Sequence, residues 1–179
     1  MSQVVVLPRV VLDQVKAELR AAAWFAALGE KLTDVVTPVG QGTVLFGLAM
    51  GFADLVSAGR MERAPRLHGV QAEACAPLVR GATIGRPAPV VPQPSIADGI
   101  RIPEPTRAER SYAAVRYSGG RWIAVSEDAI ERAWRQAAAV GLLMEPTSAV
   151  AIAGARVLNL ARGTVLIITG SGIKAIDRY

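Results

Sequence analysis

The chain has 179 residues, of which 51% are hydrophobic and 20% are charged. This length and composition supply enough apolar residues to bury a core, which argues against disorder. The net charge of +5 comes from arginines scattered along the sequence, without the basic and aromatic interleaving that is typical of nucleic-acid binding. We therefore expect residues 1–179 to form one globular domain that does not bind nucleic acid.

The cysteine content and the apolar runs indicate the cellular compartment of the protein. Cys75 is the single cysteine, so no internal disulfide can form, as is usual in a reducing environment. The N-terminal segment has a short apolar run but neither the basic start nor the cleavage site of a signal peptide. No apolar run reaches the roughly 18 residues that a membrane helix requires. These features predict a cytoplasmic protein without a membrane segment.

Helices and strands alternate along the first half of the chain. Amphipathic periodicity marks the helices, glycines mark their ends, and short continuous apolar runs mark strands that are buried on both faces. In chain order these signals predict a helix over 10–28, a strand over 34–39, a helix over 43–58, a strand over 66–71 and a helical turn over 72–80, which Pro77 interrupts.

The second half begins with a proline-rich stretch over 81–105, which predicts a long loop that crosses the fold. Loops of this length inside a domain usually serve a function. Thr106 and Glu109 form a capping-box pattern for a helix that runs to about Ser118, and Ser126 is typical of a helix N-cap. The remaining elements are expected to be a strand over 122–125, a helix over 126–140, a helix over 145–160 and a strand over 164–168.

The alternation of strand and helix predicts an α/β fold with a mostly parallel, twisted sheet flanked by helices. In such sheets, ligands bind beyond the carboxyl ends of the strands, where backbone N–H groups at helix starts are free. Two glycine-containing turns occupy such positions. They are Gly40-Gln41-Gly42-Thr43, which precedes a helix, and Thr169-Gly170-Ser171-Gly172, which follows the last strand.

Each turn has a functional and a structural interpretation. A phosphate beside the turn at 40–43 could accept N–H bonds from the helix start, and the glycines would leave room for its approach. Taken alone, however, this stretch favours a plain tight turn, because an isolated glycine pattern has many false positives. Thr169 could present its hydroxyl at the end of the sheet, or the second turn could simply cap the strand and begin a flexible tail.

Other reactive side chains carry weaker signals. His68 has no neighbouring ligand at metal spacing, so we expect a packed or surface histidine and no metal site. Cys75 lies near a helix start, which could lower the pKa of its thiol, but a small buried residue is the default interpretation. Asp98 and Glu145 lie in loops beside glycine or proline, and either could be a solvated acid.

Six segments in a fixed order resemble the C-terminal half of the threonine synthase family. They are PVGQGTVLFGLAMGF, RLHGVQAEACAPL, SIADGIRI, VSEDAIERAW, EPTSAVAIAG and TGSGIKA. Members of that family are fold-type II pyridoxal-phosphate enzymes, related to serine/threonine dehydratases and to the β subunit of tryptophan synthase. Each motif is modest alone, but their order over residues 35–174 makes the resemblance specific.

The resemblance implies pyridoxal 5′-phosphate as the cofactor. The turn at 40–43 would hold the cofactor phosphate, the segment 97–99 would pass close to the ring, and the hydroxyl of Thr169 would meet the ring nitrogen. Glu145 resembles an acid near the active site. The cofactor-binding residues that the resemblance implies are Gly40, Gln41, Gly42, Thr43, Asp98, Gly99, Glu145, Thr169 and Gly170.

The catalytic lysine is where the sequence departs from the family. The Schiff-base lysine belongs to the N-terminal half of these enzymes, and none of Lys16, Lys31 and Lys174 lies in the lysine motif. Without that amine, the chain by itself should not catalyse the family reaction. No catalytic residue is therefore assigned.

The sequence and the resemblance leave two functions open. The first is the cofactor-binding portion of a lyase or synthase that eliminates or replaces groups at the β or γ carbon of an amino-acid substrate. An N-terminal-half subunit would supply the lysine. The alternative is a non-catalytic phosphate- or metabolite-binding module, or a degenerate product without function. Because the missing half would cover apolar surface or a strand edge, we expect a hetero- or homo-oligomer.

Overall fold

The computed structural model describes residues 32–160 and 163–173. The predicted helix over 10–28 and all three lysines lie outside these residues. The described elements are β1 (Asp34–Pro38), α2 (Thr43–Ser57), β2 (Arg66–Ala72), η2 (Glu73–Cys75), α3 (Pro77–Arg80), η3 (Asp98–Ile100), α4 (Ala108–Ser118), β3 (Trp122–Val125), α5 (Glu127–Ala139), α6 (Pro146–Leu158) and β4 (Thr164–Leu166).

The described strands form one sheet in the order β3-β2-β1-β4, and every pair is parallel. Asp34 at the start of β1 lies opposite both Arg66 of β2 and Thr164 of β4. This confirms the predicted α/β fold with a parallel sheet. Because parallel strands share one carboxyl edge, the segments that follow β1 and β4 lie next to each other.

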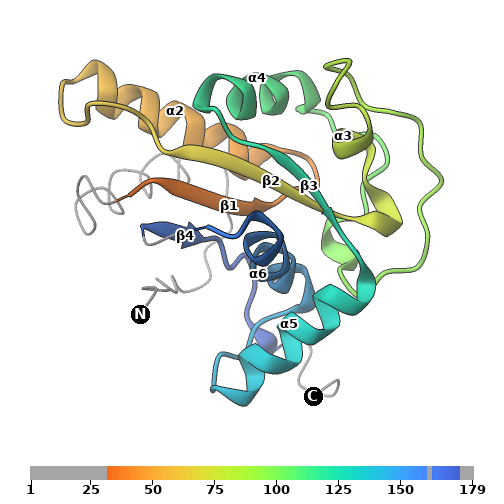
Figure 1. Ribbon diagram of the computed structural model, residues 1–179. Helices are drawn as coiled ribbons and strands as arrows, with labels where there is room; N and C mark the ends of the chain where they lie inside the picture. Colours follow the sequence, from red (N-terminus) through yellow and green to blue (C-terminus); the bar gives the residue numbers. More distant parts are fainter. Residues whose placement is uncertain (1–31, 161–162, 174–179) are drawn as a thin grey trace.

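Helices cover both faces of the sheet, as Figure 1 shows. One core lies between the sheet and the α2–α4 layer, and a second lies between the sheet and the α5–α6 layer. Adjacent residues of β1 serve different cores, since Val35 belongs to the first and Val36 to the second. The central strands are therefore buried on both faces, which explains their continuous apolar sequences.

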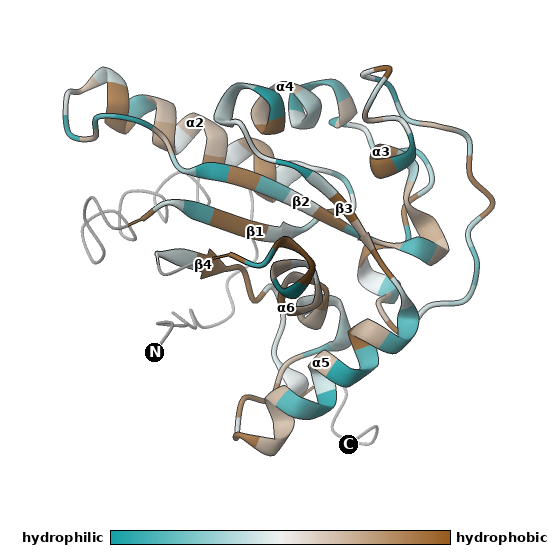
Figure 2. Ribbon diagram, in the orientation of Figure 1, coloured by the Kyte–Doolittle hydropathy of each residue, from teal (hydrophilic) through white to brown (hydrophobic). Residues whose placement is uncertain are grey.

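The two helices of the second layer differ in how deeply they are buried. Figure 2 shows hydrophobic residues along much of α6, whereas α5 carries many hydrophilic ones. In α5, Ile130, Ala133, Trp134 and Ala137 face the core. α6 packs against α5 on one side and the sheet on the other, so most of its residues are buried.

Of the two helix starts for which the sequence offers a capping signal, one agrees with the structure and one does not. The Ser126 hydroxyl caps α5 by accepting the Ala129 N–H at 3.3 Å, as predicted. The predicted capping box of α4 is wrong: Arg107 is the N-cap residue, and no side chain caps the helix. The Thr106 hydroxyl instead donates to Gln41 Oε1 at 3.0 Å, because tertiary contact brings that acceptor alongside.

Smaller differences concern element lengths. β2 continues to Ala72, one residue beyond its predicted end. α6 ends at Leu158 rather than at residue 160, because Asn159 adopts a left-handed conformation with φ of 49° that terminates the helix. β4 ends at Leu166, although the Ile167 N–H still donates to the Val36 carbonyl at 2.9 Å.

The long loop over 81–105 runs outside the sheet and returns across its carboxyl edge (Figure 1). Backbone hydrogen bonds from Ala88 to Pro77 and from Gln93 to Ala74 hold its first part. Its second part is held by the Ile96 N–H, which donates to Glu127 Oε2 at 2.9 Å. These bonds place η3 beside the segments that follow β1 and α5.

Candidate functional site

The glycine loop, residues 40–43, connects the end of β1 to the start of α2. Gly42 is the N-cap residue of α2, with φ of 88°, and it provides no side-chain hydrogen bond to the first turn. That turn also contains no acidic residue. The N–H groups at the positive end of the helix dipole therefore lack a side-chain acceptor, which is the arrangement that favours an anion.

The glycine loop is hydrogen-bonded to the residues at the start of α4. Gln41 Oε1 accepts the Thr106 N–H at 2.9 Å, and the Gln41 carbonyl accepts the Arg107 N–H at 3.2 Å. Arg107 Nη1 also donates to Thr43 Oγ1 at 3.1 Å. The carbonyl end of the Gln41 side chain is thus used to fix the loop, which the sequence did not indicate.

η3 packs directly against this loop. A Cβ atom at Gly40 would lie 3.3 Å from Ile100 Cα and 3.2 Å from Ile102 Cγ1. A Cβ atom at Gly99 would lie 3.0 Å from Thr147 Oγ1, in the first turn of α6. The glycines at 40 and 99 therefore permit close packing of the loop, η3 and α6. Asp98 belongs to the same segment but is exposed to solvent.

The start of α6 holds the turn that follows β4. Ser148 is fully buried, and its Oγ accepts the Gly170 N–H at 2.9 Å. The same Oγ lies 3.3 Å from Thr169 Oγ1. The Glu145 N–H donates to the Gly170 carbonyl at 3.2 Å, and a Cβ atom at Gly170 would overlap the Glu145 carboxylate.

These contacts join the predicted residues into one group at the carboxyl edge of the sheet. Gly40 packs on η3, Gly99 packs on Thr147 of α6, and the neighbouring Ser148 holds Thr169. The glycine loop and the Thr169 turn follow adjacent parallel strands. Their proximity therefore has a structural basis in strand order and in the contacts that η3 and α6 make between them.

Three residues of this group carried no functional signal in the sequence. Ser148 lies within EPTSA, but its contact with Thr169 depends on how α6 packs against the end of β4. Arg107 and Ser111 lie on α4, and only the packing of α4 against α2 brings them to the glycine loop. Sequence spacing cannot reveal contacts that depend on the relative placement of two helices.

A second polar cluster lies at the opposite edge of the sheet, where the strands begin. Asp34 accepts from Arg66 Nε at 2.8 Å and Arg66 Nη2 at 2.9 Å, and its Oδ1 lies 2.8 Å from His68 Nε2. The Arg121 N–H donates to His68 Nδ1 at 3.1 Å. His68 Nδ1 is therefore the unprotonated nitrogen, and Nε2 donates to Asp34.

The environment lowers the pKa of both Asp34 and His68 in this cluster. Burial alone would raise the pKa of Asp34, but hydrogen bonds from Arg66, His68 and Thr33 hold it below its usual value. Burial lowers the pKa of His68, and this outweighs the effect of the Asp34 carboxylate. His68 is thus a buried neutral histidine that joins β1 to β2, in agreement with the packed interpretation.

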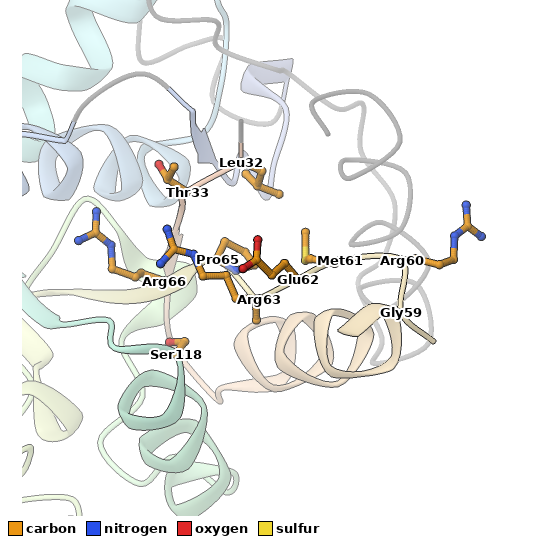
Figure 3. A pocket seen from close by; sticks show the side chains of 11 residues that line it. Leu32, Thr33, Gly59, Arg60, Met61, Glu62, Arg63, Pro65, Arg66 and Ser118 are labelled. Atoms are coloured by element: carbon orange, nitrogen blue, oxygen red, sulfur yellow. The ribbon is translucent and has the colours of Figure 1, made fainter. Parts of the chain in front are cut away.

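A cavity of about 860 Å³ lies beside this second cluster, far along the strands from the glycine loop. Figure 3 shows that it is lined mainly by the connection from α2 to β2, including Arg60, Met61 and Arg63. Arg60 points away from the other labelled side chains in this view. Despite its volume, this cavity is not the candidate site, because none of the predicted cofactor-binding residues lines it.

The remaining reactive residues support no further centre. Cys75 is buried, and burial raises the pKa of its thiol, which does not favour a reactive thiolate. Within residues 32–160 and 163–173, no three His, Cys, Asp or Glu side chains are grouped to hold a metal ion. No helix in these ranges is long and apolar enough to cross a membrane.

Comparison with known proteins agrees with this architecture. Residues 14–170 match the family described as pyridoxal-phosphate dependent enzyme. The chain belongs to this family, and its fold is that of the fold-type II members. Solved structures with the same fold include the threonine deaminase of T.th., with a TM-score of 0.72 and 27% identity over 88% of this chain and 56% of that one.

Curated relatives of the chain include threonine synthases. That of Synechocystis sp. is 32% identical over 155 residues, which cover 84% of this chain and 39% of the relative. That of Methanosarcina acetivorans is 33% identical over 150 residues, which cover 78% of this chain and 37% of the relative. The chain therefore spans less than two-fifths of the length of these relatives. Over this span it resembles threonine synthases.

The residues present fit the phosphate group of such a cofactor. The start of α2 offers N–H groups without a side-chain acceptor, and Thr43 and Arg107 add polar groups beside them. No acidic side chain occupies the first turn of α2. At the neighbouring turn, Thr169 offers a neutral hydroxyl that is only partly buried.

Proposed function

We propose that this chain is the cofactor-phosphate-binding portion of a pyridoxal-phosphate-dependent lyase or synthase resembling threonine synthase. The observation that supports this most strongly is the continuous packing from Gly40 through Gly99 and Ser148 to Thr169, at the carboxyl edge of the sheet. Pyridoxal phosphate supplies the electron sink that elimination and replacement on an amino-acid substrate require.

Each part of the group has a distinct role in this proposal. The N–H groups that begin α2, with the hydroxyl of Thr43, bind the phosphate. Gly40 keeps a side chain out of the space between the loop and η3, and Gly99 does the same between η3 and α6. Thr169 would offer the ring nitrogen a neutral hydroxyl rather than a carboxylate. Asp98 is exposed beside Gly99, and the Glu145 carboxylate lies against Gly170.

We further propose that another polypeptide, an N-terminal-half subunit, supplies the Schiff-base lysine, and that the chain alone is inactive. Several large apolar side chains are more than 60% exposed, which suits association with another chain. They are Ile84, Val91, Tyr117, Val140, Val157 and Ile173. A homo-oligomer would cover such residues equally well. Co-expression with a lysine-bearing partner distinguishes a homo-oligomer from a complex with an N-terminal-half subunit.

Calorimetry of the isolated chain tests the binding part of the proposal. Pyridoxamine 5′-phosphate is a suitable probe, because it carries the phosphate and the ring but has no aldehyde to react with lysines. We expect saturable binding of this compound and much weaker binding of pyridoxamine, which has no phosphate. Absence of heat for both compounds would contradict the assignment of the glycine loop.

Co-expression tests the split-enzyme part. The chain would be produced with a polypeptide that contains the family lysine motif, and the complex would be examined for the visible absorbance of lysine-bound cofactor. Failure to develop this colour with any such partner would exclude the split enzyme. Saturable binding by the lone chain that no partner alters would instead support the non-catalytic phosphate- or metabolite-binding module.

A further inference from the structure

The side chain of Arg107 reaches the glycine loop from a different helix. Arg107 is the N-cap residue of α4, and α4 lies beside α2 on the same face of the sheet (Figure 1). Its backbone N–H donates to the Gln41 carbonyl at 3.2 Å, and its Nη1 donates to Thr43 Oγ1 at 3.1 Å. The main chain and the guanidinium are thus both anchored to the loop.

The charge of this guanidinium has no counter-ion among the described carboxylates. The ion pairs formed within residues 32–160 and 163–173 use Arg66, His68 and Arg135, and none includes Arg107. The nearby first turn of α2 also lacks an acidic residue. A half-buried cation therefore lies beside the start of α2, where the helix dipole is positive, and a bound anion would offset this positive charge.

The hydroxyl of Thr43 can also donate a hydrogen bond to an anion. Because its oxygen accepts a hydrogen bond from the guanidinium, its own hydrogen is directed elsewhere. No acceptor for that hydrogen is present among the described residues. The guanidinium and the hydroxyl therefore form a pair of donors at the start of α2.

We propose that Arg107 is a phosphate-binding residue of this site and that, with Thr43, it recognises the dianion of a phosphate monoester. This inference rests on the proposed function, since it concerns the phosphate group of the same cofactor. The planar guanidinium suits this role because it can donate two hydrogen bonds to one phosphate group. The remaining positive charge at the start of α2 would then be neutralised by the ligand.

Calorimetric titration of the full chain and three variants tests this assignment. The probe is pyridoxamine 5′-phosphate, and pyridoxamine serves as the phosphate-free comparison. Loss of a hydrogen bond to a charged group predicts that Arg107→Gln weakens binding of the phosphorylated probe by roughly tenfold to a hundredfold. Arg107→Lys keeps the charge without the planar geometry, so its affinity should lie between those of Arg107→Gln and the wild type.

Arg110→Gln is the matched control. Arg110 lies one turn further along α4 beside the same hollow as Arg107, but its guanidinium stacks over the Phe46 ring at 4.9 Å from the centroid and forms no hydrogen bond with the glycine loop among the described residues. The variant has the same change in net charge, and we expect its affinity to stay within about twofold of the wild type, as for an exposed charge screened by solvent. Circular dichroism would show whether each variant is folded.

The outcomes separate this inference from the proposed function. If the wild type binds neither probe, the proposed cofactor site itself is wrong. If the wild type binds the phosphorylated probe but Arg107→Gln binds it equally well, the role of Arg107 is wrong and the site stands. Equal losses in Arg107→Gln and Arg110→Gln would also overturn it, because they would indicate a general charge effect. Should Arg107→Gln not fold, wild-type affinity in Arg107→Lys would overturn the specific role of the guanidinium.

Discussion

Gly42 is a residue at which two independent constraints exclude a side chain. Its φ of 88° lies in the left-handed region, which L-residues with a Cβ atom adopt only at a cost. In addition, a Cβ atom at this position would overlap the hydroxyl of Ser111, which is fully buried on α4. The first constraint is local to the turn, whereas the second arises only when α4 packs against α2.

Substitution of Gly42 by alanine should therefore destabilise the fold markedly. The left-handed conformation and the overlap with Ser111 together predict a loss of about 2–4 kcal/mol in the free energy of unfolding. Gly59→Ala is the matched control, because Gly59 also has a positive φ, of 66°, but nothing lies within 4 Å of its added Cβ. The control should lose only about 1 kcal/mol in urea unfolding. Equal losses would show that the contact with Ser111 is unimportant.

His68 makes the stability depend on pH. Burial lowers its pKa in the folded chain, whereas the unfolded residue keeps an ordinary value near 6.5. As the pH falls below that value, the unfolded state binds a proton that the folded state does not, so stability decreases until the folded pKa is reached. The Asp34 carboxylate, whose folded pKa is lowered, adds a further loss of stability in more acidic solution, below its unfolded pKa of about 4.

The measurement is urea unfolding between pH 7.5 and 5. We expect the free energy of unfolding of the wild type to fall over this range, and the decrease to be absent in His68→Gln. Because His68 is the single histidine of the chain, no other imidazole can produce the effect. A wild-type stability that stays constant from pH 7.5 to 5 would contradict the lowered pKa.

At the scale of elements, the start of α6 determines where the turn after β4 is placed. Pro146 occupies the first turn, and the following residues Thr147 and Ser148 are directed at η3 and at the Thr169 turn, respectively. One helix start thereby fixes two segments that are far apart in the sequence. The buried Ser148 hydroxyl is the central contact, because it serves both Gly170 and Thr169.

Ser148→Ala should release this turn. The Gly170 N–H would lose its buried acceptor, which predicts a loss of about 1–3 kcal/mol in stability and faster hydrogen exchange of the Gly170 amide. Ser126→Ala is the control: it removes the cap of α5 and should cost about 1 kcal/mol without changing exchange at Gly170. Unchanged protection of the Gly170 amide in Ser148→Ala would contradict the assigned contact.

At the scale of the whole molecule, the sheet has helices on both faces, yet large apolar side chains remain exposed on several elements. Val140 and Ile173 are 81% and 77% exposed, and Val91 on the long loop is 79% exposed. The chain also spans less than two-fifths of the length of its threonine synthase relatives. Association with a second polypeptide would cover such surface.

We therefore expect the purified chain to associate with itself or with an N-terminal-half subunit. Sedimentation velocity over increasing concentration should show the average mass rising above that of a single chain. Addition of the N-terminal-half subunit should replace self-association by a defined complex if the two compete for the same surface. A chain that remains monomeric at high concentration and does not bind the added subunit would contradict this expectation.

The sequence by itself determined the class of fold and the edge at which the candidate site lies. Alternating strands and helices specify a parallel sheet, and glycine turns after strands lie at its carboxyl edge wherever the strands pair. The order of six motifs also identified the family, which comparison then confirmed. These features are encoded by neighbouring residues, so they can be recognised without knowing how the elements pack.

Only the tertiary structure decided which side chains meet. The pairing of Asp34 with His68 joins residues 34 positions apart, and the contact of Arg107 with Thr43 joins residues 64 apart. The failed capping box at Thr106 has the same origin, since Gln41 offered its hydroxyl a tertiary partner. The physical reason is that such contacts depend on strand order and on the packing of helices against each other, which local sequence patterns do not specify.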